Sequence, residues 1–332
     1  MKPTIYDVAE KAGVSIATVS YVMNNQKVGK KSREKVLKAM EELNYKPSLL
    51  ASALTGKRTT TIGFLLPDLA NPFVAEMARR VEDRAHERGF NVVICSTDSD
   101  KEKEALYTSL LRQKRVDGFI FAGDLKNVDV VKELVGEQTP VVLLAVSHPA
   151  VSVNSVTVDD FTGGYQVASH LISLGHKRIA VIAEEAISSR ERIRGYKHAL
   201  QDQGIEIDED LIVTSESSFE DGERLADELL NTSHPPTAIF ACNDILAIGS
   251  FLAARKKNRS IPGDLSVAGF DNTLLSKSSD PPLTIVEQPI QDMCSQAVDL
   301  LIEEIEGKST RKQRIVLLPD LIIRQSTGPC RF

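Results

Sequence analysis

The sequence lacks tryptophan and has few aromatic residues and cysteines, and each shortage narrows the range of functions. Aromatic residues make up 5% of the 332 residues, too few to indicate a surface on which nucleic-acid bases stack. The four cysteines are scattered and lack the spacing of a metal or redox motif: Cys95, Cys242, Cys294 and Cys330. We therefore expect buried, reduced thiols, and we expect neither a metal ion nor a cofactor.

Long apolar runs, a targeting segment and catalytic motifs are also missing. No apolar stretch is long enough to cross a bilayer, and residues 1–7 lack the apolar core of a signal peptide. We expect a chain that works in the cytoplasm without a membrane partner. The sequence contains no Walker loop, no G-x-S-x-G elbow and no H-E-x-x-H pair, so we expect no enzymatic activity.

The sequence does contain a strong asymmetry of charge. Residues 1–58 hold eleven Lys and Arg against five Asp and Glu, a net charge of +6, which leaves −12 on the other residues because the total is −6. A small basic segment joined to an acidic body is typical of a nucleic-acid-binding module carried by another domain. A solvated basic surface would give the same balance, so charge by itself leaves both interpretations open.

Helical patterns fill the basic segment. Thr4 can cap a first helix that Gly13 ends, Ser15 can cap a second helix over residues 16–23, and a third spans 32–43. The apolar face of the first helix consists of Ile5, Val8, Ala9 and Ala12. Two short helices joined by a Gly-containing turn form a helix-turn-helix, whose second helix reads bases in the major groove. A generic three-helix bundle would have the same periodicity.

From residue 59 onward, short apolar runs alternate with helical segments. The predicted strands are Thr61–Leu66, Val92–Ser96, Gly118–Ala122, Val141–Ala145, Arg178–Ala183, Ala238–Ala241 and Leu265–Gly269. This alternation predicts parallel sheets with helices on both faces, and seven such units indicate two doubly wound lobes. Ligands of such sheets bind at the carboxyl ends of the strands, so we expect a ligand cleft between the lobes.

Several segments carry a resemblance to a known family. "TIYDVAEKAGVSIATVSYVMNN" and "VLKAMEELNYKPSLLASALTGKRTTTIGFLLPD" resemble the headpiece and hinge of the LacI/GalR family of bacterial regulators. "GYQVASHLISLGHKRIAVI", "PTAIFACNDILAIGS" and "DLSVAGFDN" continue the resemblance through nearly the whole chain. It implies a repressor of carbohydrate or related catabolic genes that binds a palindromic operator as a homodimer. The rival class is a solute-binding protein without a transcriptional role.

The resemblance also implies a division of the chain. Residues 1–46 would form the helix-turn-helix domain, residues 47–58 a hinge helix and linker, and residues 59–332 a periplasmic-binding-protein-like α/β body. Crossovers near 157, 288 and 319 would divide this body into two doubly wound lobes. The N-lobe would comprise about 59–157 and 289–318, and the C-lobe about 158–287 and 319–332.

The DNA contacts are likewise implied by the resemblance. Base contacts are expected from Ile16, Ala17 and Tyr21, and Leu54 matches the hinge wedge that opens a base step in the minor groove. Backbone contacts are expected from Thr4, Ser15, Thr18, Ser20, Asn24, Tyr45 and Ser48. Many members have Arg where this chain has Tyr21, and tyrosine cannot pair bidentately with guanine. In the absence of the family resemblance, residues 47–58 would be interpreted as a linker that happens to contain leucines. A helix this short has little stability by itself in water.

Five residues match the family's effector contacts: Asp68, Phe73, Arg192, Asn243 and Asp271. Their charged donor, amide and carboxylates suit the hydroxyls of a sugar, sugar acid or sugar phosphate. Two departures make a flat purine or unmodified hexose a poorer match. Many members have Asp at the end of the strand over residues 141–145, and an aromatic residue where Ser217 aligns.

Two further expectations concern acidic residues. Asp244 is expected to cap its own helix rather than to contact a ligand. The acidic residues of the helix over 290–306 would repel a phosphoprotein such as the one that docks on the family's catabolite-control member. These residues are Asp292, Asp299, Glu303 and Glu304.

Overall fold

The computed structural model describes residues 3–23, 27–45, 58–309 and 311–331. It separates into two compact units, Met1–Thr59 and Thr60–Phe332, each with its own hydrophobic core. Asn24, Ser48 and Leu54 lie outside the described residues, so the contacts expected of them stay predictions.

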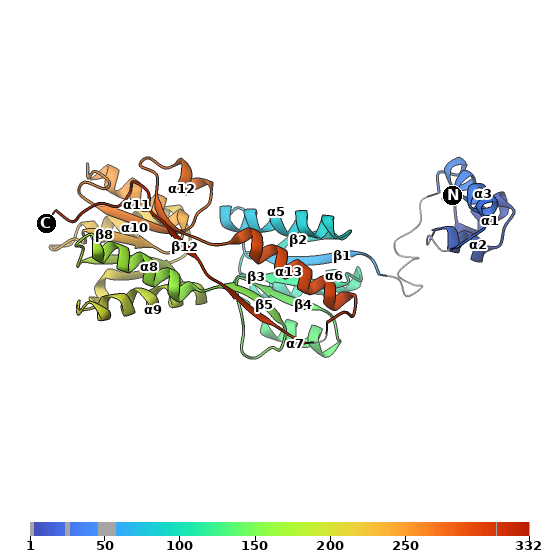
Figure 1. Cartoon of the computed structure of the whole chain (residues 1–332), viewed down its shortest axis with the longest axis horizontal. Coiled ribbons are helices and arrows are strands. Elements are labelled where there is room, and N and C mark those ends of the chain that lie inside the picture. The colour runs from blue at the N-terminus through green and yellow to red at the C-terminus, as the bar shows by residue number, and fades with distance from the viewer. Residues whose placement is uncertain (1–2, 24–26, 46–57, 310, 332) are drawn as a thin grey trace. The chain divides into compact units, whose positions relative to one another are not determined.

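The N-terminal unit is all helical, with α1 (Ile5–Ala12), α2 (Ile16–Met23) and α3 (Lys30–Glu42) (Figure 1). Its buried core consists of Val8, Ala9, Ala12, Val19, Val22, Val36 and Ala39. The third helix begins two residues earlier than predicted, because the Gly29 carbonyl accepts hydrogen bonds from the N–H groups of Ser32 and Arg33. The predicted helix-turn-helix is therefore present.

The predicted caps also form. The backbone N–H of Thr4 donates to the Asp7 carboxylate at 2.6 Å, and the Asp7 N–H donates to the Thr4 hydroxyl at 3.4 Å. This reciprocal capping box satisfies two N–H groups that the first turn of α1 leaves without partners. Gly13 ends α1 with a left-handed φ of 62°, and the Ser15 hydroxyl accepts from the N–H of Thr18 at 3.2 Å.

The second unit contains two six-stranded sheets. The N-lobe sheet has the order β11-β5-β4-β3-β1-β2, and all its strand pairs are parallel. The strands are β1 (Thr61–Leu66), β2 (Asn91–Ser96), β3 (Gly118–Ala122), β4 (Val141–Leu144), β5 (Asn154–Val158) and β11 (Arg314–Leu317). Helices α5 (Pro72–Glu87) and α13 (Ile290–Ile305) cover one face, while α6 (Lys101–Gln113) and α7 (Val128–Gly136) cover the other.

The C-lobe sheet has the order β12-β10-β9-β8-β6-β7, with β12 antiparallel to β10 and the other pairs parallel. The strands are β6 (Ile179–Glu184), β7 (Ile212–Ser215), β8 (Ala238–Ala241), β9 (Ser266–Asp271), β10 (Thr284–Glu287) and β12 (Asp320–Ile322). Helices α8 (Asp160–Ser173) and α9 (Ile187–Asp202) lie on one face, and α10 (Phe219–Leu230) and α11 (Asp244–Lys256) on the other. A 3-10 turn (Glu209–Leu211) and the short helix α12 (Leu274–Ser278) complete the lobe.

The chain changes sheets three times: after β5, between β10 and α13, and between β11 and β12 (Figure 1). The expected α/β fold class is confirmed, and all seven predicted strands form within two residues of their expected ends. Five strands were not predicted: β5, β7, β10, β11 and β12. None of the described helices combines the length and apolar character that a membrane span requires.

Candidate functional site

One face of α2 is free to meet DNA. Val19 and Val22 are buried against the other two helices, whereas Ile16 and Tyr21 are 42% and 50% exposed, and Ala17 is exposed as well. Exposed apolar side chains on a helix that begins just after a tight turn match the geometry of a reading helix. The three described residues expected to contact bases therefore share an accessible surface.

The residues expected to contact the DNA backbone differ in their surroundings. Thr4 and Ser15 are exposed at helix N-termini, where their hydroxyls already take part in caps. The hydroxyls of Ser15 and Thr18 lie 2.9 Å apart. Ser20 and Tyr45 are half-buried, and Tyr45 packs against the headpiece core. Phosphate contacts of these side chains stay predictions.

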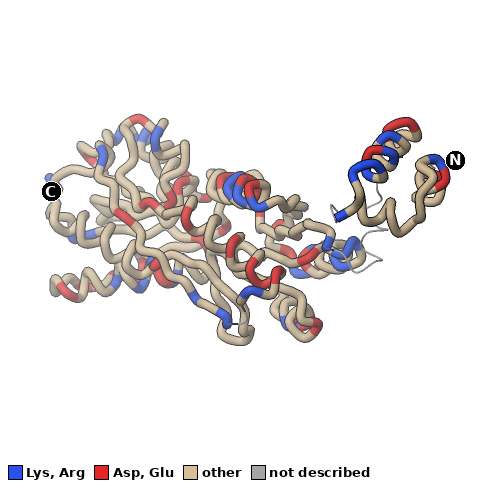
Figure 2. The backbone as a smooth tube through the Cα atoms, turned by 45° about the vertical axis from the view of Figure 1, so that its right-hand side comes forward, with Lys and Arg blue, Asp and Glu red and all other residues tan. Residues whose placement is uncertain are grey.

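A cavity of about 1000 Å³ lies between the lobes of the second unit. It opens at the carboxyl ends of the strands, which is where doubly wound sheets bind ligands. All five residues expected to contact an effector line it, Asp68 and Phe73 from the N-lobe and Arg192, Asn243 and Asp271 from the C-lobe. Acidic positions are frequent in this middle part of the body (Figure 2).

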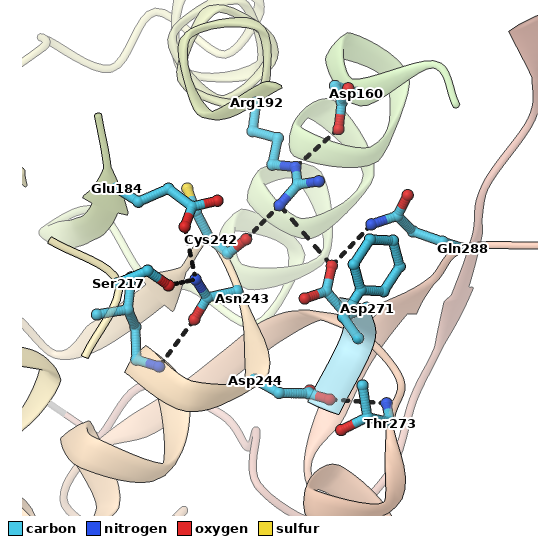
Figure 3. Close-up of polar contacts among 12 residues, drawn as sticks. Asp160, Glu184, Arg192, Ser217, Cys242, Asn243, Asp244, Asp271, Thr273 and Gln288 are labelled. Carbon is cyan, nitrogen blue, oxygen red and sulfur yellow. Dashed lines mark hydrogen bonds and ion pairs between the residues drawn. The ribbon is translucent and has the colours of Figure 1, made fainter. Parts of the chain in front are cut away.

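Arg192 is the centre of the polar network in the cavity (Figure 3). It is 4% exposed, its Nε donates to Asp160 Oδ1 at 2.8 Å, and its Nη1 donates to the Cys242 carbonyl and lies 3.9 Å from Asp271 Oδ1. The guanidinium also stacks 3.7 Å from the centre of the Phe270 ring. Burial lowers the pKa of Arg192, but the Asp160 and Asp271 carboxylates raise it further, so the side chain stays charged.

Two glycines allow Arg192 to reach this position. A Cβ atom on Gly164 of α8 would lie 2.0 Å from the Arg192 carbonyl oxygen, and one on Gly195 of α9 would lie 2.0 Å from the Phe161 carbonyl oxygen. Only glycine permits this approach of the α8 and α9 backbones. Gly163-Gly164 therefore serves helix packing and is not a phosphate loop.

Asp271 ends β9 in an unusual backbone conformation. Its φ of 101° lies in the region that favours glycine, a strain of about 1–3 kcal/mol that is common at binding sites. Its Oδ1 accepts from Gln288 Nε2 at 2.7 Å, and Gln288 lies on the crossover that leads from β10 to α13. Burial raises the pKa of Asp271 to about 7, although Arg192 opposes the shift.

Asn243 takes the helix-capping role that the sequence predicted for Asp244. Asn243 caps α11, since its Oδ1 accepts from the Leu246 N–H at 2.9 Å, and its Nδ2 donates to Ser217 at 2.7 Å and to Glu184 at 3.4 Å. The prediction that Asp244 caps α11 is wrong: its carboxylate instead accepts from the Thr273 N–H at 2.7 Å, and the residue is 1% exposed. The Nδ2 group of Asn243 can therefore donate to a ligand only by exchanging one of these bonds, whereas its Oδ1 can still accept a further hydrogen bond.

Sequence reasoning missed three residues of the site: Asp160, Glu184 and Gln288. Each lies at the end of a strand: Asp160 two residues after β5, Glu184 as the last residue of β6, and Gln288 directly after β10. The strand-end rule would have found them if β5 and β10 had been predicted and β6 had been extended by one residue. Ala145 and Ser217, the positions that depart from many family members, also line the cavity.

The acidic face expected on α13 is partly neutralised. Asp299 accepts from Arg84 at 3.1 and 2.7 Å and also pairs with Arg88, and Glu304 pairs with Lys312. The repulsion of a phosphoprotein expected from this helix is therefore weaker than its sequence suggests.

A helix-turn-helix unit with an exposed reading helix, joined to a two-lobed body with a polar cavity, defines a ligand-responsive DNA-binding regulator. The comparisons with known proteins agree. Residues 4–48 match the family of bacterial regulatory proteins named after LacI, and residues 59–325 match the periplasmic binding proteins and sugar binding domain of LacI family. The chain belongs to the LacI family of bacterial transcriptional regulators.

Relatives cover the whole chain. It is 45% identical to the HTH-type transcriptional regulator DegA of Bacillus subtilis (strain 168), over 99% of each chain. It is 38% identical to Catabolite control protein A of Priestia megaterium, over 98% of this chain and 100% of that protein. A solved Lac repressor dimer bound to operator and an anti-inducer matches with a TM-score of 0.89 at 31% identity, over 99% and 100% of the two chains. The predicted family is confirmed, and the relatives are named as regulators rather than enzymes.

Proposed function

We propose that this chain is a repressor of carbohydrate or related catabolic genes that acts in the cytoplasm and binds a palindromic operator as a homodimer. A small hydroxylated effector would bind in the interlobe cavity and control operator binding. The proposed division is a DNA-binding domain over 1–46, a hinge over 47–58 and an effector-binding body over 59–332. We assign the chain no catalytic activity.

The pairing of Arg192 and Asp271 carries the effector proposal. Among the described residues, Arg192 Nη2 and Asp271 Oδ2 have no hydrogen-bond partner, although both side chains are more than nine-tenths buried and line the cavity. One offers donors and the other an acceptor, which suits two neighbouring hydroxyls. A ligand that makes both bonds would use hydrogen-bonding groups that the described residues leave open in the cavity.

DNA binding can be tested on the reading helix of the full-length chain. An operator selected from a random library would be labelled, and its affinity measured by fluorescence anisotropy at two salt concentrations. Tyr21→Ala should weaken binding, and Leu37→Ala, an equally exposed side chain on α3, should not. Affinity that does not fall with salt would contradict the proposal, because phosphate contacts release counterions.

Effector binding can be tested by thermal shift. Sugars, sugar acids and sugar phosphates would be screened, since a ligand of the folded state raises its melting temperature. The compound that binds should alter operator affinity in the anisotropy assay. A compound that stabilises the body but leaves operator affinity unchanged would favour a solute-binding role instead.

A second copy of the chain would cover apolar side chains on the N-lobe. Val93 and Ile94 of the edge strand β2 are each 37% exposed, and Leu106 and Leu110 of α6 are 55% and 41% exposed. The similar Lac repressor is a dimer in its operator complex. Analytical ultracentrifugation should detect a dimer that Ile94→Glu dissociates. An unchanged sedimentation coefficient would place the interface elsewhere.

A further inference from the structure

The charge of the cavity lining restricts the class of effector that it can bind. The inference drawn from this charge rests on the proposed function and extends it. Nine carboxylates but only two cationic side chains line the cavity. Net charge of one sign in a concave site selects ligands of the opposite sign. The strength of this selection depends on how many of the lining charges already have a partner of opposite charge within the protein.

Some of the carboxylates are compensated. Asp160 pairs with Arg192, and the guanidinium also lies near Asp271, so the positive charge at the centre of the site is already balanced. At the rim, Asp98 pairs with Lys103 and Asp221 with Arg224.

Five lining carboxylates have no ion pair with any residue that the structure describes: Asp68, Asp124, Glu184, Glu185 and Glu216. Against them stands Lys126, an exposed side chain at the cavity wall. The lining is therefore strongly acidic even after the protein's own pairs are formed.

Three of the unpaired carboxylates, from both lobes, lie near the loop that follows β6. Glu184 ends β6 and Glu185 follows it, and the N–H of Ile187 donates to both oxygens of Asp124 from the N-lobe, at 3.2 and 3.3 Å. Glu184 is half-buried beside Asn243, whose amide is 3.4 Å away (Figure 3). We call Asp124, Glu184 and Glu185 the acidic wall, and Glu184 is its member beside Asn243.

We infer that the effector is a hydroxylated small molecule with a protonated amine, such as an amino sugar, and is neither a sugar acid nor a sugar phosphate. Its hydroxyls would bond Arg192 and Asp271, and its ammonium would donate to Glu184 at the acidic wall. An ammonium group has three donors and no acceptor, which matches carboxylate oxygens that lack a cation. An anionic ligand would have to lie among unpaired carboxylates, and the buried arginine that could attract it is already neutralised.

Isothermal titration calorimetry of the full-length chain at low salt tests the inference with matched ligands. The sets would be glucose, glucosamine, gluconate and glucose 6-phosphate, and the equivalent galactose and mannose compounds. Within the set that binds, the amino sugar should bind about tenfold more tightly than its neutral parent. This ratio corresponds to the contribution of one charge-assisted hydrogen bond. The acid and the phosphate should bind more weakly than the parent.

Variants assign the preference to the acidic wall. Glu184→Gln should remove most of the amino-sugar advantage, measured as the ratio of the affinities for the amino sugar and for its neutral parent in the same variant. Glu206→Gln removes an exposed carboxylate of the same lobe outside the cavity, and should preserve the advantage. If Glu184→Gln lowers the melting temperature, Glu185→Gln provides the same test on an exposed side chain.

The outcomes separate this inference from the proposed function. Tighter binding of a neutral or anionic compound, lost on replacement of Arg192, would overturn the inference and leave the effector cavity in place. An amino-sugar advantage that survives both wall variants would also overturn it. If no compound in the panel binds, the effector role proposed for the cavity fails together with the inference.

Discussion

Replacement of Arg192 by methionine should destabilise the body strongly, even before any effector is added. Methionine keeps much of the buried volume but removes the cation between Asp160 and Asp271, whose side chains are 13% and 8% exposed. Removal of one partner from a buried ion pair costs about 3–5 kcal/mol, because the other charge is left buried and unpaired. The hydrogen bond to the Cys242 carbonyl and the contact with the Phe270 ring are lost as well.

The loss of stability should depend on pH with a definite sign. Burial already raises the pKa of Asp160 and of Asp271, and Arg192 opposes both shifts. Without the arginine both pKa values rise further, so the folded variant takes up protons that the unfolded chain does not bind. The deficit in unfolding free energy should therefore be largest above about pH 7 and should shrink toward about pH 5.

Urea denaturation followed by circular dichroism would measure this effect, since the chain has no tryptophan to report unfolding. Arg194→Met is the matched control: Arg194 is 65% exposed, pairs with Glu191 and lies 4.9 Å from the centre of the Phe161 ring, so the change should stay within about 1 kcal/mol. Adding Asp160→Asn to Arg192→Met should recover part of the loss, because it removes one unpaired charge. A loss below about 1 kcal/mol, or one independent of pH, would refute the interpretation of Arg192 as a buried ion-pair centre.

Three further predictions follow from individual residues. Gly164→Ala should force α8 and α9 apart and lower the melting temperature, whereas Gly136→Ala, with nothing within 4 Å of the added Cβ, should be neutral or stabilising. Burial raises the pKa of Asp271 from 3.8 to about 7, so its ionisation makes the fold less stable as pH rises through this interval. Asp271→Asn should therefore remove that loss in thermal melts while abolishing effector binding in calorimetry. Tyr21→Arg should favour guanine at one symmetric pair of operator positions by about 1–3 kcal/mol, and identical selected operators for both proteins would contradict this.

Most of the strands that could be predicted have residues buried on both faces; β2 is an exception, a partly exposed edge strand that was predicted from its apolar run. β1, β3 and β8 are continuous apolar runs, as parallel strands between two helical layers must be. β5 escapes this signal because it begins with Asn154 and Ser155, which are buried but polar. Asn154 is satisfied there by hydrogen bonds with Glu304 and Gln313, partners that are distant in sequence.

Three of the four edge strands escaped prediction for a different reason. β7, β11 and β12 lie at sheet edges and are partly exposed, so they lack a long apolar run. The residues of the candidate site could be predicted only where their strands could be. Asp271 ends β9, which was predicted, whereas Gln288 follows β10, which was not. That Asn243 and not Asp244 caps α11 could not be predicted, since both residue types cap helices and Asp244 instead bonds the distant Thr273.

The contacts of the two central site residues suggest how occupancy of the cavity could alter the lobes. Asp271 is bonded to Gln288 on a crossover between the lobes, and Asp124 of the N-lobe caps the first N–H of α9, the helix that carries Arg192. A ligand that bonds Arg192 and Asp271 would therefore contact residues next to two connections between the lobes, the Asp271–Gln288 hydrogen bond and the bond from α9 to Asp124. It can shift the lobe angle only by its difference in affinity for the two arrangements, so we expect a coupling of about 1–3 kcal/mol with DNA binding. Asp124→Asn weakens one link without touching these two ligand contacts, and it should change the effector's influence on operator affinity more than it changes the affinity for a neutral effector. Equal changes in both would mean that the link between Asp124 and α9 plays no part in the coupling.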